Sequence, residues 1–263
     1  MGFWTFEHVV TVIPTFAIFI LFSLLMRRLL LKRSYATRML PIRIIAVIIV
    51  IIEIGKQICS AARGYDLFHI PLHFCSIFLY VLPLMAFYKG KYEGQVRSVA
   101  TSTMTALFIG MLIIPGVIYG GDRISAFFTD YLSFHTVFFH NLVILALMLC
   151  IALDLHKPRV SREENIFIAI FGTVFVVIAA TASHLLQTNY SNFLYTTVGP
   201  IKLLVEEIAA ALGETVTTVI YTVSLAILHV LLMLLTNLIY YFACTLKERL
   251  LARFEKNKDG RAG

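Results

Sequence analysis

The stretch PIRIIAVIIVIIEIGKQICSAA, residues 41–62, decides the fold class, because it is long and apolar enough to cross a bilayer as one helix. About 20 helical residues span the hydrocarbon layer. Across the chain 59% of residues are hydrophobic and 14% are charged, which is too apolar for a soluble domain. We therefore expect an all-α polytopic membrane bundle, a single domain over 1–263, with seven transmembrane helices near 8–26, 41–62, 70–88, 99–119, 132–153, 165–187 and 216–243.

The distribution of Lys and Arg between alternate connections predicts the orientation. One side carries 18 of the 22, the other carries Arg63, Arg123 and Lys202, and Lys56 lies within a span. Because cytoplasmic loops hold the excess, we expect the N-terminus outside and the C-terminus in the cytoplasm, in the cell membrane. No Lys or Arg precedes the first span, which we expect to be retained rather than cleaved as a signal peptide. The basic clusters indicate membrane anchoring and not nucleic-acid binding. Oligomeric state is not predicted.

A polar stripe runs along the second span. Glu53, Lys56, Gln57 and Ser60 recur at the spacing of one helix face. Intramembrane charges are costly and normally face the bundle interior, where they pair with each other or line a cavity. We expect the stripe to form a polar wall toward the outer end of the bundle, with mutual neutralisation of Glu53 and Lys56 as the simpler alternative.

The third and fifth spans each carry a reactive side chain near the predicted outer surface. In a regular helix His73 and Cys75 point about 200° apart, so His73 is a poor base for the thiol. Cys75 and His140 lie roughly 8 Å and 12 Å inside their helix starts, at matching depth. An imidazole that takes the proton of a thiol makes it a nucleophile able to hold an acyl group. A lone Cys and a lone His in a membrane are, however, more often packing or hydrogen-bonding residues.

The remaining candidates leave alternatives open. His184, Gln187 and Asn189 close the sixth span and are placed to hydrogen-bond a headgroup or an oxyanion. Together with His69, His73, His135 and His140 they also permit a histidine-ligated metal in a membrane hydrolase, although Pro71 interrupts the i, i+4 pair His69 and His73. A Cys59–Cys75 disulfide is geometrically conceivable, but buried thiols are the simpler reading.

Four motifs, in order and spacing, resemble a known family: IPLHFCSI (70–77), IIP (113–115), FFHN (138–141) and HLLQTNYSNFL (184–194). The chain is similar to the bacterial YwaF-type integral membrane proteins, which are related to eukaryotic transmembrane protein 164 and, more distantly, to the androgen-induced-gene threonine hydrolases. The resemblance covers about 45–195. It implies an acyltransferase that moves fatty acyl chains between phospholipids and lysophospholipids through a cysteine thioester, without a cofactor.

Carried onto this chain, the resemblance makes Cys75 the nucleophile and His140 its base. Glu53 matches an acidic position of the second span, and Asn189 and Tyr190 match an outer Asn-Tyr pair. We expect Lys56, Gln57, His73 and His184 to bind substrate or orient these groups. Family members often carry Glu at position 73 and Thr-Pro-Asp at 114–116, where this chain reads Ile-Pro-Gly. If that Asp orients the base, Asp122 is the candidate replacement.

The longest outer connection contains a predicted amphipathic helix near 200–213. Pro200 suits a helix start, and Ile201, Leu204, Val205, Ile208 and Leu212 share one face. Such a helix acts either as a lid over a lipid entrance or as a packed loop element. The rival functional hypothesis is a lipid or small-molecule transporter, for which the polar stripe would have to continue across the bundle. The inner halves of the spans offer few polar groups beyond Thr101, Ser102 and Thr103.

Overall fold

The computed structural model describes residues 4–196 and 198–259, and each regular element within them is a helix. Six of these helices are long and apolar enough to cross a membrane: α1 (Phe6–Leu30), α3 (Leu40–Ala62), α5 (Glu93–Ile113), α7 (Tyr131–Ala152), α8 (Arg162–Leu186) and α10 (Glu214–Asp259). The all-α, multi-pass class that composition predicts is therefore confirmed. The shorter helices are α2 (Tyr35–Arg38), η1 (Leu67–His69), η2 (Phe74–Ile77), α4 (Phe78–Phe87), α6 (Gly116–Tyr119), η3 (Gly121–Arg123), η4 (Tyr190–Asn192) and α9 (Gly199–Leu212).

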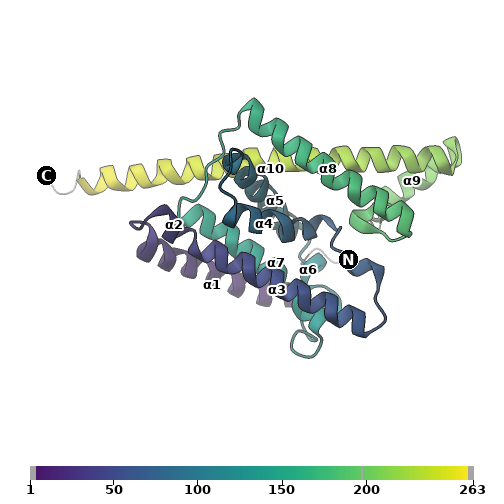
Figure 1. The fold of residues 1–263 in the computed structure, drawn as a ribbon, viewed down its shortest axis with the longest axis horizontal. Coiled ribbons are helices and arrows are strands. Elements are labelled where there is room, and N and C mark those ends of the chain that lie inside the picture. The colour runs from purple at the N-terminus through teal and green to yellow at the C-terminus, as the bar shows by residue number, and fades with distance from the viewer. Residues whose placement is uncertain (1–3, 197, 260–263) are drawn as a thin grey trace.

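The long helices pack in two groups with α4 and α5 between them. Helices α1, α3 and α7 lie along one side, and α8 and α10 along the other (Figure 1). Helix α5 contacts both groups, and its middle is buried from Ser98 to Ala106. One apolar core joins α3, α4, α5, α7, α8 and α10. The exposed faces of α1 and α10 are apolar along most of their length, as lipid-facing helices require.

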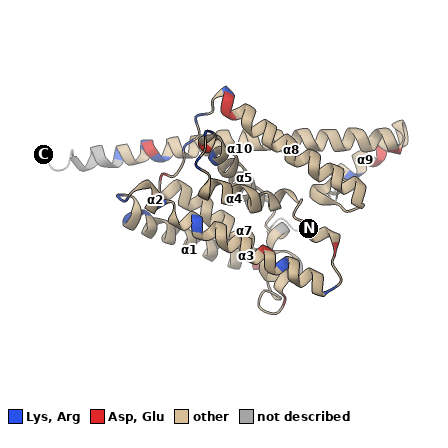
Figure 2. Cartoon of the chain, viewed as in Figure 1, with Lys and Arg blue, Asp and Glu red and all other residues tan. Residues whose placement is uncertain are grey.

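The two ends of the bundle differ in charge. Where α3 begins and α4 ends, Arg43 Nε donates to the Ala86 carbonyl at 3.2 Å. Lys and Arg gather mainly at this end, toward the left of Figure 2. We call it the basic end. At the opposite end Arg63, just after α3, pairs with Asp130, which caps α7, at 3.0 Å.

The third expected span differs from the structure. Its helical part is 14 residues, Phe74–Phe87, and begins as the 3-10 turn η2. Our expectation of a regular helix from residue 70 is wrong, because Pro71 has no N–H and His73 is extended. Fourteen residues reach only about 21 Å along a helix axis. Seven full-length spans thus stay a prediction, as does the orientation.

The fourth expected span is displaced. We predicted 99–119, whereas α5 runs Glu93–Ile113 and α6 is separate. Ile114 leaves the helical region, with φ −132° and ψ 74°, because a residue before proline is pushed out of it by Pro115. The loop that follows therefore brings Arg123 of η3 to the end of the bundle opposite the basic end.

The C-terminal part matches the sequence prediction more closely. Helix α9 lies within one residue of the predicted 200–213 and begins with Pro200 in its first turn. It packs against α10, which is a single helix far longer than the predicted 216–243. A membrane-surface or lid role for α9 stays a prediction.

Candidate functional site

A polar cavity of about 420 Å³ lies between α3, η2, α5 and α7, at the end opposite the basic end. Both Cys75 and His140 line it, as the sequence predicts for a nucleophile and its base. Glu53, Lys56 and His73 line it too. The other wall residues are Phe68, His69, Ser76, Leu107, Arg123, Leu132, Ser133, His135, Thr136 and Phe139.

Glu53 is the centre of the charged wall. Its carboxylate lies 2.7 Å from Lys56 Nζ, accepts a 2.7 Å hydrogen bond from Gln57 Nε2, and lies 2.9 Å from His135 Nε2. The side chains of Glu53, Lys56 and His135 are 7%, 12% and 8% exposed. A carboxylate this deeply buried is tolerated only with such partners. The stripe predicted on α3 is thus a cavity wall and an ion pair at once.

Gln57 and Ser60, the outer half of the stripe, hold the segment that follows α3. Gln57 Nε2 also donates to the His69 carbonyl at 2.8 Å, and Ser60 Oγ lies 2.7 Å from His69 Nδ1. Tyr65 donates to Gln57 Oε1 at 2.7 Å. These bonds fix the segment that leads from α3 to η2, and with it the position of Cys75.

His140 has its tautomer set by its own helix. Its Nδ1 lies 2.5 Å from the Thr136 carbonyl, and a carbonyl can only accept, so Nδ1 carries the proton. The other ring nitrogen, Nε2, is then the basic one. The orienting group that the sequence left open is therefore a backbone carbonyl. Asp122 is exposed and does not line the cavity, so its predicted role as orienter is wrong.

His73 is held by backbone groups on both sides of its ring. Its Nε2 donates to the Phe68 carbonyl at 3.1 Å, and its Nδ1 accepts from Ser191 N–H at 3.5 Å. Tyr190 packs edge-on against the ring. A ring that donates from one nitrogen and accepts at the other is neutral. His73 thus positions the turn that carries Cys75.

Four predicted residues do not line the cavity: Gln57, which holds Glu53 from behind, and three residues of later elements. His184 Nε2 lies 3.1 Å from Thr222 Oγ1 and joins α8 to α10. Asn189 closes its own loop through the carbonyl of Tyr195 and the N–H of Leu194, both at 3.0 Å. Tyr190 is fully buried and donates to the Leu67 carbonyl at 2.6 Å. Asn189 and Tyr190 thus brace the loops around the cavity, whereas His184 holds two helices together outside it.

The sequence reasoning missed four polar wall residues and misjudged a fifth. Ser76, Arg123, Ser133 and Thr136 were not singled out as site residues, and His135 was considered only as a metal ligand. Comparing how deep each polar side chain lies along its helix would have found His135. It lies about one and a half turns before His140 on α7, and its ring contacts Glu53 on α3. In the described ranges no group of three His, Cys, Asp or Glu side chains is arranged as metal ligands. All four cysteines are free, so the Cys59–Cys75 disulfide does not form.

A sequence model of the TMEM164 family matches residues 3–241. The chain belongs to the TMEM164 family. Searches of curated proteins and of solved structures found no match. Family membership confirms the resemblance that the four motifs indicate. The motifs covered about 45–195, whereas the family match covers nearly the whole bundle. The cavity residues of α3, η2 and α7 all lie within the matched range.

Proposed function

We propose that this TMEM164-family protein is an acyltransferase that carries a fatty acyl chain as a thioester on Cys75 and passes it to a lysophospholipid or another lipid acceptor. One observation carries the proposal: Cys75 and His140 line one cavity, and the proton on His140 Nδ1 leaves Nε2 as the base. Leu107, Leu132 and Phe139 supply an apolar wall beside the charged one, as an acyl ester requires.

The reaction proceeds in two balanced half-reactions. His140 Nε2 takes the proton from Cys75 Sγ, and the thiolate attacks the ester carbonyl of the donor. The resulting oxyanion is stabilised by Lys56, the ammonium group in the same wall. When the C–O bond breaks, the departing alkoxide takes the proton from His140, leaving the thioester. In the second half His140 deprotonates the acceptor hydroxyl, which attacks the thioester, and Sγ leaves and regains the proton.

Orientation completes the proposal. With the basic end in the cytoplasm, as the Lys and Arg distribution predicts, the cavity opens at the outer side of the cell membrane. A transporter would need a polar path through the bundle. Thr101, Thr103 and Thr105 instead donate to carbonyls of their own helix α5, which favours a one-sided site.

The test is mass spectrometry of the purified full chain in phosphatidylcholine nanodiscs. We expect a fatty acyl adduct on the Cys75 peptide that neutral hydroxylamine removes, as it removes thioesters. Cys75→Ala should abolish this adduct and His140→Ala should slow its formation by about 10²- to 10⁴-fold. Cys59→Ser is the matched control, since Cys59 is a second free thiol at the same end that does not line the cavity.

Two outcomes contradict the thioester mechanism: no adduct on the unsubstituted chain, or an adduct that persists unchanged in Cys75→Ala. Adding a lysophospholipid then separates transfer from hydrolysis. A new diacyl product indicates an acyltransferase, whereas release of free fatty acid in its place indicates a hydrolase and contradicts the transfer step.

A further inference from the structure

A second polar cavity, of about 360 Å³, lies at the basic end between the starts of α5 and α8. It shares no residue with the Cys75 cavity. Its cationic wall residues are Lys91, Arg97, Lys157 and Arg159, joined by the ring of His156. Nothing in the proposed acyl transfer uses these groups.

The carboxylates near this cavity are largely occupied. Glu164 is 5% exposed, and its two oxygens accept from Ser98 Oγ and from the backbone N–H of Arg159. Arg97 pairs with Glu93, and Lys157 pairs with Glu248 of α10. Across the described part of the chain no ion pair includes Lys91 or Arg159. Two cationic side chains thus face the cavity without a carboxylate partner. Of the two carboxylates that line the cavity, Glu164 is held by hydrogen bonds and Glu163 is exposed.

His156 is a neutral, hydrogen-bonded member of the wall. Ser98 Oγ uses its hydrogen toward Glu164, so His156 Nε2 donates to Ser98 Oγ at 2.7 Å. Burial, followed by the positive charges of Arg97 and Arg159, lowers the pKa of His156 to about 3. The neutral ring adds no charge, so the charge of the wall comes from four cationic side chains, Lys91, Arg97, Lys157 and Arg159, against the carboxylates of Glu163 and Glu164.

Two helix N-termini also face this cavity. Gly94 and Gln95 belong to the first turn of α5, and Ser161 is the N-cap of α8. The first turns of helices present N–H groups and partial positive charge, which suits an anion.

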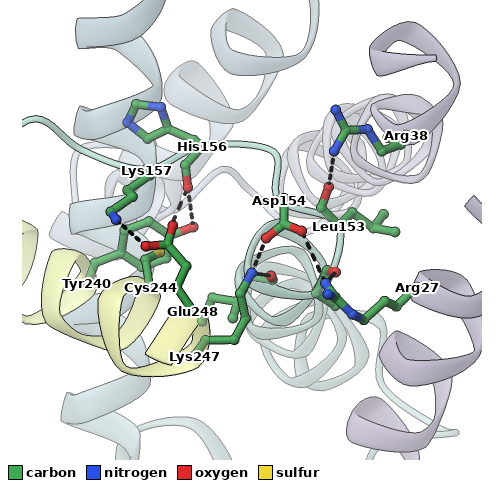
Figure 3. A network of polar contacts seen from close by, with 12 residues as sticks. Arg27, Arg38, Leu153, Asp154, His156, Lys157, Tyr240, Cys244, Lys247 and Glu248 are labelled. Atoms are coloured by element: carbon green, nitrogen blue, oxygen red, sulfur yellow. Dashed lines mark hydrogen bonds and ion pairs between the residues drawn. The ribbon is translucent and has the colours of Figure 1, made fainter. Parts of the chain in front are cut away.

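The first part of the loop that carries His156, Lys157 and Arg159 is anchored to neighbouring helices. Figure 3 shows Asp154 bridging Arg27 of α1 and Lys247 of α10. In the same view Tyr240 donates to the His156 carbonyl at 3.2 Å. Arg38 donates to the Leu153 carbonyl at 2.9 Å. These bonds from three helices fix the backbone of 153–156, the segment that leads into Lys157 and Arg159.

We propose that this cavity binds a phosphate group, with Arg159 and Lys91 as its charged contacts and the first turns of α5 and α8 as backbone donors. Arginine matches phosphate oxygens in a bidentate manner and lysine acts as a point charge. The phosphate belongs either to a phospholipid headgroup at this end of the bundle or to a soluble phosphate compound.

The test uses the full chain and two probes. Native mass spectrometry from phosphatidylcholine nanodiscs containing phosphatidylglycerol or phosphatidate measures retained lipid. Thermal unfolding with millimolar inorganic phosphate measures soluble binding. We compare the unsubstituted chain with Arg159→Gln and Lys91→Gln combined, and with Arg33→Gln. Arg33 is an exposed cation of the same end outside the cavity, and so is the matched control.

We expect saturable binding that weakens about tenfold or more in the double variant and less than about twofold in the control. Binding seen only with lipid assigns the headgroup, and binding of inorganic phosphate assigns the soluble source. The proposal is overturned if neither probe binds saturably, or if Arg33→Gln weakens binding as much as the double variant. All variants must elute as the unsubstituted chain does. Arg159 and Lys91 are exposed, so their replacement leaves the core intact.

Discussion

The carboxylate of Glu53 on α3 lies 2.9 Å from Nε2 of His135 on α7, in a close contact rather than an aligned hydrogen bond. This contact joins the two helices that form most of the cavity wall. Because the same carboxylate also contacts Lys56 at 2.7 Å, three ionisable groups share one buried site. Their balance of charge therefore affects both stability and the chemistry proposed for Cys75.

Removing one member of the buried Glu53–Lys56 pair should be far worse than removing both. Glu53→Ala leaves the Lys56 ammonium without its carboxylate, and we expect the free energy of unfolding to fall by about 3–5 kcal/mol. Glu53→Leu combined with Lys56→Met should recover most of that loss, since no uncompensated charge remains. Denaturant unfolding in detergent measures each variant. Losses that simply add in the double variant would contradict a coupled pair.

The close approach of α3 and α7 depends on a glycine. A Cβ at Gly55 would collide with the ring and hydroxyl of Tyr131, which donates to the Ile52 carbonyl at 2.9 Å. Tyr131 begins the helix that carries His135 and His140, so moving it displaces the base from Cys75. We expect Gly55→Ala to cost about 1–3 kcal/mol of stability and to slow adduct formation.

The matched control for that variant is Gly110→Ala. An added Cβ at Gly110 meets nothing within 4 Å, and alanine in a helix is favoured over glycine by about 1 kcal/mol. Thermal unfolding should therefore show a gain, or no change, at position 110. Equal destabilisation by both substitutions would mean that packing against Tyr131 is not the cause.

The sequence predicts this fold where the signal is local and fails where neighbours decide. Apolar length locates α3 and α7 to within a residue or two, because a membrane helix satisfies its own backbone. It misplaces the start of the third span, where the backbone of 65–73 is held by Gln57, Ser60 and Tyr190. Those bonds come from other elements, and no periodicity in the segment itself reveals them.

For the cavity, too, some residues could be predicted from the sequence and others could not. Cys75 and His140 line one cavity as expected, although the depth argument assumed a regular helix from residue 70 and Cys75 lies in the 3-10 turn η2. The group that orients His140 escaped prediction because it is a main-chain carbonyl, which every residue has and no motif marks. Likewise His184 and Asn189 have suitable chemistry, but their partners Thr222 and Tyr195 lie outside the cavity.

Because a backbone carbonyl orients His140, the acidic residue suggested by sequence is dispensable. Asp122→Asn should leave the rate of acyl adduct formation on Cys75 within about twofold, against the 10²- to 10⁴-fold loss expected for His140→Ala. Thr136→Val should likewise be mild, since the Thr136 hydroxyl donates to the Leu132 carbonyl and not to the imidazole. Time-resolved mass spectrometry of the Cys75 peptide measures all three. A collapse in Asp122→Asn would restore the carboxylate as orienter.

Asp130 should make the bundle sensitive to acid. It caps α7 by accepting from Ser133 N–H at 2.8 Å and pairs with Arg63 at 3.0 Å; these contacts, the Ser133 bond foremost, lower the pKa of Asp130 below its usual value. A carboxyl group whose pKa is lower in the folded chain than in the unfolded chain stabilises the fold. This stabilisation is fully present at pH values above the unfolded pKa, about 3.9. That contribution is lost as the pH falls through the folded pKa. Asp130→Asn keeps an N-cap residue and removes the titration, so its melting temperature should fall less than that of the unsubstituted chain between about pH 5 and pH 3. Equal slopes for both chains in thermal unfolding across this range would show that Asp130 does not carry the acid sensitivity.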